Sequence, residues 1–238
     1  MKTKKQKRML LGIIGGMGPH ADTLFLSEVR RLTCAASDRG HIPTLYDGNC
    51  LRPDRSDCLT GRSRATPLPS LLHSLRFLEK CGADVIAMPC NTAHAWIKPL
   101  IRAKKRKTVL LDVTDAVAIE CRKRKLQNVC LLATKGTLYA DVYGDAFFKH
   151  GIDRVPLTKE AAERVHQLIK RIKAGEGCSL TEIEPLLKNV RCDGFVLGCT
   201  ELSVALKNTE LPAYKYVDSL SVLAEKAVSI FGKLKDER

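Results

Sequence analysis

The chain has 238 residues, of which 45% are hydrophobic and 5% aromatic, and it carries a formal net charge of +14. A chain of this length can bury a sizeable core, and its apolar runs fall short of the roughly 20 residues that a membrane-spanning helix needs. The ten cysteines lack CxxC spacing and no export signal is recognisable. We therefore expect a cytoplasmic protein with free thiols, and neither a zinc site nor a disulfide framework.

Positive charge gathers in the first eight residues and in the runs 102–107 and 122–125. Lys and Arg are favoured near helix C-termini, so we interpret both runs as solvated helix ends. Few aromatic residues interleave with them and no nucleic-acid-binding motif is present, which disfavours nucleic acid as a partner. Residues 1–8 are interpreted as a basic tail, because Gly15 and Gly16 interrupt the apolar run that follows and make it too short for a signal peptide.

Short apolar runs alternate with amphipathic stretches along the chain. Strand-like apolar runs lie at 10–14, 84–88, 108–111, 128–132 and 194–197. Helical periodicity marks 68–80, 114–125 and 160–173. This alternation predicts an α/β fold in which parallel sheets are flanked by helices, and in such sheets ligands bind at the carboxyl ends of the strands.

A weak internal repeat divides the chain into two halves. In residues 85–92 and again in 195–201, an apolar strand turns at Pro89 or Gly198, then gives a cysteine and a hydroxyl residue. The repeat predicts two pseudo-symmetric lobes, each a parallel sheet flanked by helices, with the active site in the cleft between them. We place the first lobe at 9–112 together with a C-terminal helix at 219–231, and the second lobe at 113–218.

The stretch 47–67 is rich in Asp, Arg, Pro and Ser and has no clear periodicity. A structureless connection of this length in a compact domain is usually either functional or disordered. We predict a binding loop that presents Arg52 and Arg55, with an exposed loop charge as the alternative interpretation of Arg55.

Cys90 and Cys199 follow equivalent strands of the repeat. A single cysteine at a strand end is more often a buried filler, but one in each half favours a functional pair. We expect each to precede a helix, with Asn91 or Thr92 as N-cap after Cys90, and a helix N-terminus lowers a thiol pKa. Glu201 would oppose ionisation of Cys199 unless its carboxylate is turned away or paired.

Two opposed thiols suit racemisation, because one group must remove the Cα proton while the other delivers a proton to the opposite face. Without a pyridoxal cofactor as electron sink, preorganised donors must stabilise the carbanion-like state. Candidate donors are the backbone N–H groups after Gly15 and Gly16, at Asn91 and Thr92, and at 134–137.

Three segments resemble signature segments of the aspartate/glutamate racemase superfamily, aspartate racemase branch. They are Gly12-Ile13-Ile14-Gly15-Gly16-Met17-Gly18-Pro19, Met88-Pro89-Cys90-Asn91-Thr92-Ala93-His94 and Gly198-Cys199-Thr200-Glu201. Their order and spacing are specific, and the resemblance runs from Leu10 to about Phe231. Glutamate racemases proper carry Asp-Ser in the opening loop, where this chain has Gly-Gly-Met.

The resemblance implies a two-lobed fold, no cofactor, no metal ion and a homodimer. It implies that Cys90 and Cys199 are the catalytic pair. From the similar Pro53-Asp54-Arg55 segment, Arg55 is expected to bind a substrate carboxylate. From Lys173-Ala174-Gly175, Lys173 is expected to bind the other end, although a solvated helix face explains it nearly as well. The remaining substrate-binding residues implied by the family are Met17, Asn91, Thr92, Thr134, Thr137 and Thr200.

These observations predict cofactor-independent racemisation of a small acidic amino acid, L-aspartate to D-aspartate, with glutamate as a further candidate substrate. Both cysteines are present, which favours racemisation over the other chemistries of the superfamily. Two alternatives stay open: a racemase of broader amino-acid specificity, and a non-catalytic protein that binds acidic ligands on the same fold.

Overall fold

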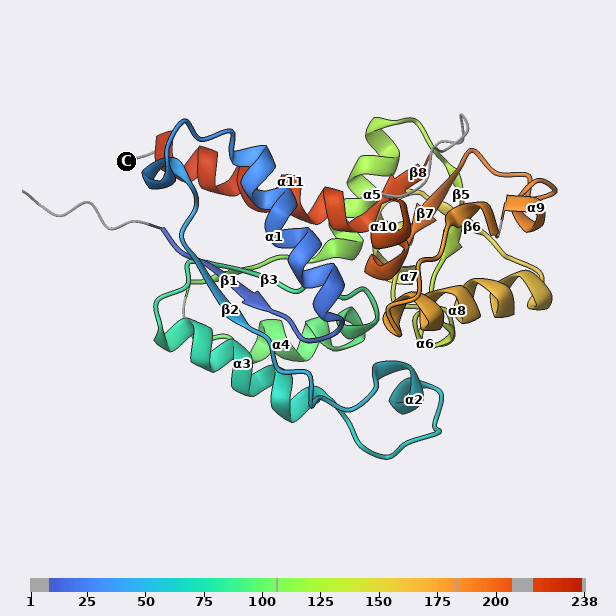
Figure 1. The fold of residues 1–238 in the computed structure, drawn as a ribbon, viewed down its shortest axis with the longest axis horizontal. Coiled ribbons are helices and arrows are strands. Elements are labelled where there is room, and N and C mark those ends of the chain that lie inside the picture. Colours follow the sequence, from blue (N-terminus) through green and yellow to red (C-terminus); the bar gives the residue numbers. More distant parts are fainter. Residues whose placement is uncertain (1–8, 106, 183, 207–215, 237–238) are drawn as a thin grey trace, which may run out of the picture.

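The computed structural model describes residues 9–105, 107–182, 184–206 and 216–236. Two four-stranded parallel sheets lie side by side, each flanked by helices (Figure 1). Their strand orders are β2-β1-β3-β4 and β6-β5-β7-β8, so both sheets follow one plan. The predicted α/β fold of two lobes is confirmed. We call the sheet that begins with β1, together with its helices, the first lobe, and the other the second lobe.

The first lobe is built around β1 and β3, which are buried along their whole length. Gly12 of β1 lets the sheet and its covering helix approach closely, because a Cβ there would lie 3.0 Å from that of Ala83 and 3.2 Å from side-chain atoms of Leu78 and Ile86. Its strands are β1 (Leu11–Ile14), β2 (Thr44–Asp47), β3 (Val85–Ala87) and β4 (Val109–Leu110). Its helices are α1 (Pro19–Thr33), α2 (Arg55–Leu59), α3 (Leu68–Lys80) and α4 (Ile97–Ala103), with 3-10 turns η1 (Asp38–Gly40) and η2 (Thr92–Trp96).

The second lobe repeats this plan around β5 and β7. Phe195 and Val196 of β7 are buried and pair in register with Cys130 and Leu131 of β5. The strands are β5 (Asn128–Leu132), β6 (Asp153–Val155), β7 (Gly194–Leu197) and β8 (Tyr216–Asp218). The helices are α5 (Val113–Lys123), α6 (Lys135–Tyr139), α7 (Gly144–His150), α8 (Lys159–Lys173), α9 (Glu184–Leu187) and α10 (Thr200–Leu206), with a 3-10 turn η3 (Leu180–Glu182).

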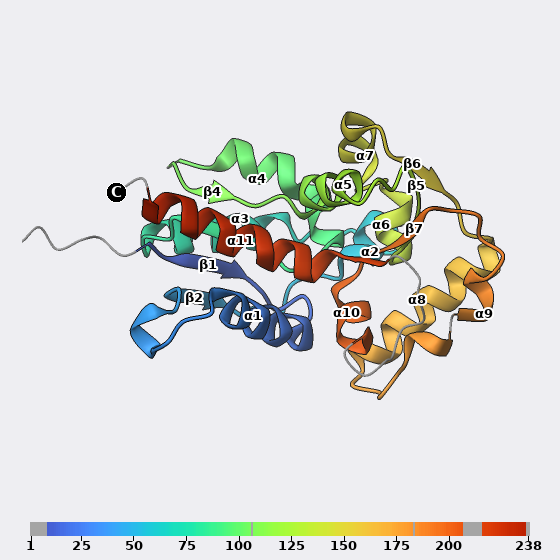
Figure 2. The same cartoon turned by 90° about the horizontal axis from the view of Figure 1, so that it is seen from above.

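The last helix, α11 (Ser219–Asp236), leaves the second lobe and lies against α1 and α5 (Figure 2). Leu220, Leu223 and Phe231 of α11 join a hydrophobic cluster that also contains residues of β1, α1 and β5. Each fully buried side chain of this size contributes roughly 1.5–3 kcal/mol. One core therefore crosses from lobe to lobe. Among the described residues, none of the helices combines the length and the apolar character needed to cross a membrane.

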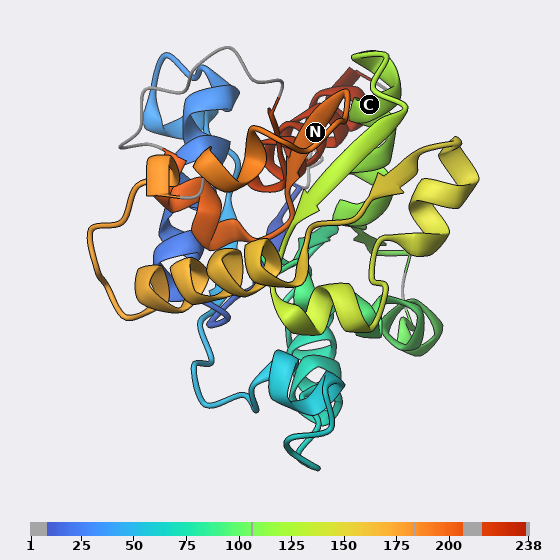
Figure 3. The ribbon, with the colours of Figure 1, turned by 90° about the vertical axis from the view of Figure 1, so that its right-hand side faces the viewer.

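The segment 47–67 is more ordered than its composition predicts. It contains α2, which begins at Arg55 because the Asp54 side chain caps it by accepting from the Asp57 N–H at 2.9 Å. Helix α2 leaves the first lobe and packs against α6 of the second (Figures 1 and 3). The approach is close because α6 has Gly136 there, where a Cβ would lie 2.6 Å from the Cα of Ser56.

Candidate active site

Both cysteines lie just beyond the carboxyl end of a central strand. Met88 and Pro89 separate Cys90 from β3, and Gly198 separates Cys199 from β7. We call residues 88–92 the Cys90 corner and residues 198–201 the Cys199 corner. Cys90 is 6% exposed and Cys199 is 4% exposed. All ten cysteines lie in described segments and are free thiols.

The two corners meet across the boundary between the lobes. The Thr200 hydroxyl donates to the Pro89 carbonyl at 3.1 Å, so the residue after one cysteine is bonded to the residue before the other. Thr200 is buried, as expected for a contact in the middle of an interface. The fold therefore brings the paired segments of the repeat together.

The Cys90 corner differs in detail from the expected helix N-terminus. The chain enters the short 3-10 turn η2, and Asn91 occupies the N-cap position without a side-chain cap hydrogen bond. Both ring nitrogens of His94 make contacts with the backbone. Nδ1 lies 2.9 Å from the Cys90 carbonyl oxygen, and Nε2 accepts from the Val113 N–H at 3.2 Å. Because both ring nitrogens are engaged, His94 fixes the backbone beneath the thiol.

The Cys199 corner places a carboxylate directly on the thiol. The Cys199 Sγ donates to Glu201 Oε2 at 2.8 Å. Burial and then the Glu201 charge raise the pKa of Cys199 well above its usual 9.0, although Lys173 acts in the opposite direction. Glu201 therefore opposes the ionisation of Cys199, as the sequence suggested for a carboxylate that faces the thiol, and burial outweighs any effect of the helix N-terminus. Cys199 holds its proton at neutral pH.

A cavity of about 190 Å³ lies between the lobes. The loop after β1, α2, the end of α8 and the start of α10 form its walls. The lining residues are Gly16, Met17, Gly18, Pro19, His20, Asp54, Arg55, Ile172, Lys173 and Glu201. Three of the residues expected from sequence, Met17, Arg55 and Lys173, are therefore in the wall.

Arg55 is a buried cation in this wall, with 8% of its surface exposed. One guanidinium nitrogen, Nη2, donates to the Met17 carbonyl at 2.8 Å. Burial opposes its charge, but the neighbouring Cys90, Asp54 and Glu201 outweigh it and raise the pKa of Arg55. Its Nε is buried and has no hydrogen-bond partner among the described residues. This nitrogen is available to an anionic ligand.

Lys173, the last residue of α8, is a second cation in the cavity wall. Its Nζ lies 3.9 Å from Glu201 Oε1, and the side chain is 32% exposed. Burial lowers its pKa, but Glu201 and then Cys199 more than offset this, so the pKa of Lys173 is raised. Beside it, Asp54 carries a lowered pKa: burial opposes ionisation, but the Asp57 N–H, Arg55 and Lys173 stabilise the carboxylate. The cavity wall thus holds two cations, Arg55 and Lys173, and two carboxylates, Asp54 and Glu201.

The other residues expected to bind substrate face the boundary between lobes and not the cavity. The Thr92 hydroxyl lies 3.0 Å from that of Thr134 and 2.9 Å from that of Thr137, and these two are 3.0 Å apart. The Asn91 amide donates to the Ser219 hydroxyl at 2.9 Å and accepts from Tyr143. With Thr200, these side chains join the lobes and hold the cysteine corners in place.

The glycine loop after β1 is also less open than expected. The Gly15 N–H donates to the Asp47 carbonyl at 2.9 Å, and the Gly16 N–H donates to Asp22 Oδ2 at 2.6 Å. Asp22 is buried, which is the main reason that its pKa is raised. These two N–H groups are used within the protein, so any oxyanion donors of this loop come from the N–H groups that follow Gly16, as the sequence suggested.

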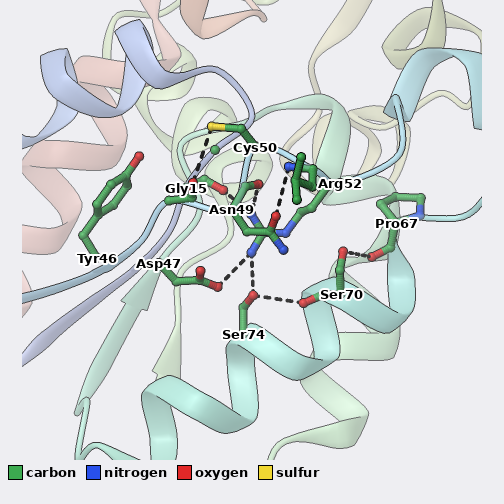
Figure 4. A network of polar contacts seen from close by, with 12 residues as sticks. Gly15, Tyr46, Asp47, Asn49, Cys50, Arg52, Pro67, Ser70 and Ser74 are labelled. Atoms are coloured by element: carbon green, nitrogen blue, oxygen red, sulfur yellow. Dashed lines mark hydrogen bonds and ion pairs between the residues drawn. The ribbon is translucent and has the colours of Figure 1, made fainter.

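Arg52 is a structural residue and does not line the cavity. Figure 4 shows its guanidinium enclosed by polar groups of the loop and of α3. It donates to the carbonyls of Gly15 and Asn49, to the Ser74 hydroxyl and to Asp47, 2.9 Å away. The expectation that the loop presents both arginines to a ligand is therefore wrong for Arg52, which fixes the loop that carries Arg55.

Sequence reasoning missed several wall residues. Pro19 and His20 begin α1, Gly18 precedes them, and Ile172 lies beside Lys173. The most informative omission is Glu201, which was considered only as an obstacle to ionisation. When the two halves of the repeat are aligned on their cysteines, Glu201 occupies the position of Thr92. A carboxylate in place of a hydroxyl group at this position could have indicated a functional role for Glu201.

Comparison with known proteins identifies the family. Residues 14–227 match the family model described as Asp/Glu/Hydantoin racemase, so the chain belongs to the Asp/Glu/hydantoin racemase family. The broad specificity amino-acid racemase RacX of Bacillus subtilis strain 168 is 25% identical over 232 residues, which cover 93% of this chain and 98% of that protein. A glutamate racemase of Lysinibacillus sphaericus strain C3-41 is 26% identical over 185 residues, 73% of this chain and 67% of that protein.

Solved structures agree with this assignment. The aspartate racemase of Picrophilus torridus superposes with a TM-score of 0.77 at 26% identity and covers 94% of each chain. The glutamate racemase of Francisella tularensis, solved in complex with D-glutamate, superposes with a TM-score of 0.70 at 15% identity, over 96% of this chain and 82% of that one. The second likeness shows the shared fold alone.

Proposed function

We propose that this protein racemises an acidic amino acid, aspartate first and glutamate second, with Cys90 and Cys199 as its acid and base and without a cofactor. The observation that carries the proposal is the meeting of the two cysteine corners, joined by the Thr200–Pro89 hydrogen bond, beside a cavity that holds Arg55 and Lys173. Two cations in one small cavity favour a substrate with two carboxylates.

The environments of the thiols suggest their resting roles. Cys199 keeps its proton because of burial and Glu201, so it is assigned as the acid. Cys90, next to the Arg55 guanidinium, is assigned as the base. The Cα proton passes to Cys90, the electron pair it leaves is delocalised into the substrate carboxylate held by Arg55, and Cys199 delivers its proton to the opposite face. The reverse reaction exchanges the two roles.

The test is proton NMR of L-aspartate and L-glutamate incubated separately in D₂O with the protein, followed by chiral chromatography. We expect loss of the Cα–H signal and appearance of the D-enantiomer. Cys34→Ser, which changes an exposed thiol, is the matched control and should racemise normally. Retention of the Cα–H signal with both substrates would refute the proposal for acidic amino acids.

A racemase of broader specificity is the second candidate, and the similarity to the broad specificity amino-acid racemase of Bacillus subtilis favours it. The same NMR experiment with a panel of neutral and basic L-amino acids separates the two. Exchange confined to aspartate and glutamate supports the first proposal, and comparable exchange across the panel supports the second.

A further inference from the structure

One oxygen of the Glu201 carboxylate is left without a hydrogen bond. Glu201 is 3% exposed, and its Oε2 accepts from the Cys199 thiol. Its Oε1 is buried and has no hydrogen-bond partner among the described residues. A buried, unpaired carboxylate oxygen is costly, so it points to a ligand that supplies the missing donor.

The position of Oε1 shows where that donor would sit. A Cβ on Gly18 would lie only 2.8 Å from Oε1, so a side chain at this position would crowd the carboxylate oxygen. On another side, Lys173 Nζ is 3.9 Å away, too far for a hydrogen bond. Gly18, Lys173 and Glu201 all line the cavity. Oε1 is therefore a buried carboxylate oxygen that belongs to a residue of the cavity wall.

A second unpaired group in the same wall has the opposite polarity. The Arg55 Nε is a buried donor without an acceptor. An α-amino acid offers a carboxylate, which accepts, and an ammonium group, which donates. The two unpaired groups therefore match the two ends of an amino-acid main chain. Asp54 is less suited to the ammonium group, because it already caps α2 and accepts from the Asp57 N–H.

We propose that Glu201 binds the α-ammonium group of the substrate through Oε1 while Oε2 holds the Cys199 thiol. The inference rests on the proposed racemase function and assigns it a recognition residue. One carboxylate would fix the amine and the proton donor together, so that the Cα of a bound amino acid lies next to Cys199. Arg55, Lys173 and Glu201 then supply two cations and one anion for the two carboxylates and one ammonium group of aspartate.

The test compares two ligands that differ in the amine. Racemic aspartate, which undergoes no net reaction, and succinate, which lacks the ammonium group, are titrated calorimetrically into the wild-type protein and into Glu201→Gln. We expect the wild type to prefer aspartate, and Glu201→Gln to reduce that preference by about 10- to 100-fold, mainly through weaker aspartate binding. Glu163→Gln, which removes an exposed carboxylate on α8 outside the cavity, should leave the preference unchanged.

A role restricted to holding the Cys199 thiol would lower turnover but leave the aspartate-to-succinate affinity ratio as in the wild type, and that result would overturn the inference. So would a wild type that binds succinate as tightly as aspartate, or that binds neither. Thermal melting of Glu201→Gln, together with its succinate affinity, shows whether the variant is folded. The Cα–H exchange of the wild type tests racemisation separately, so either proposal can fail without the other.

Discussion

The Cys90 corner and the Cys199 corner follow the same backbone plan, yet the residue two positions after each cysteine has a different task. Thr92 shares its hydroxyl with Thr134 and Thr137 across the lobe boundary, whereas Glu201 bonds the neighbouring thiol and faces the cavity. The Cys90 corner makes hydrogen bonds between the lobes, and the Cys199 corner carries the carboxylate of Glu201. A repeated fold can thus place two identical thiols at equivalent strand ends while the side chains around them differ.

The largest effect is expected when one of the two thiols is removed. Cys90→Ser and Cys199→Ser are each expected to lower racemisation by about 10²- to 10⁴-fold, because one of two proton-transfer groups is lost. Each variant keeps the base for one face, so each should still exchange the Cα proton of one enantiomer in D₂O, and the two variants should differ in which one. Proton NMR of pure L- and D-aspartate measures this. Equal exchange of both enantiomers by either variant would contradict the assignment of one thiol to each face.

A smaller effect, on substrate binding, is expected when Arg55, the cation beside Cys90, is changed. Arg55→Lys keeps the charge but loses the Nε donor and the planar guanidinium, which we expect to weaken substrate binding by about 1.5–3 kcal/mol and raise KM about 10- to 100-fold. Chiral chromatography of initial rates measures KM and kcat separately. Arg62→Lys is the control, since Arg62 lies in the same segment but is half exposed and pairs with Asp57. An unchanged KM would remove Arg55 from substrate binding.

The Thr92→Val variant tests the hydroxyl contacts of the Cys90 corner with the second lobe. This change removes one of three mutually bonded hydroxyls at nearly constant shape, and we expect the free energy of unfolding to fall by about 1–2 kcal/mol. Urea denaturation measures it, and Thr23→Val on the exposed face of α1 serves as control. A loss of activity with unchanged stability would instead return Thr92 to the substrate-binding role that the sequence suggested.

The smallest effect concerns the proton on Cys199. Because its pKa is raised above 9.0, its thiolate fraction should still grow about tenfold per pH unit from pH 7 to pH 9. Alkylation by iodoacetamide, followed by peptide mass spectrometry, should rise in parallel without levelling off. Glu201→Gln removes the charge and weakens the acceptor that hold the proton, so it should lower this pKa and accelerate labelling by up to about tenfold at pH 8. A rate that levels off below pH 9 would show that the proton is not held in this way.

Much of the fold follows from the sequence, since the central strands are continuous apolar runs. The runs 128–132 and 194–197 coincide with β5 and β7. The strands that sequence reading missed, β2, β6 and β8, are sheet edges such as Thr44–Asp47, where polar residues and partial exposure hide the pattern. Edge strands are held mainly by backbone hydrogen bonds to a neighbour, and these leave little trace in side-chain periodicity.

The site was predictable only in part, for a related reason. Motif positions identify the residues near a cysteine but not the direction in which their side chains point. Asn91 and Thr200 directly follow the cysteines, yet they turn into the lobe boundary, and Arg52 turns into its own loop three residues before Arg55. Those directions depend on contacts with residues far away in the chain, such as Ser219 and Pro89.

The course of α11 has a consequence for how the protein is made. Helix α1 begins at Pro19, but it packs against a helix that begins at Ser219, so all the residues between these two helices must be synthesised before the contact can form. Until then, the apolar face of α1 around Phe25 and Val29 stays uncovered. Such distant pairing slows folding and exposes nascent chains to aggregation. Removing residues 219–236 should therefore destabilise the first lobe as severely as the second.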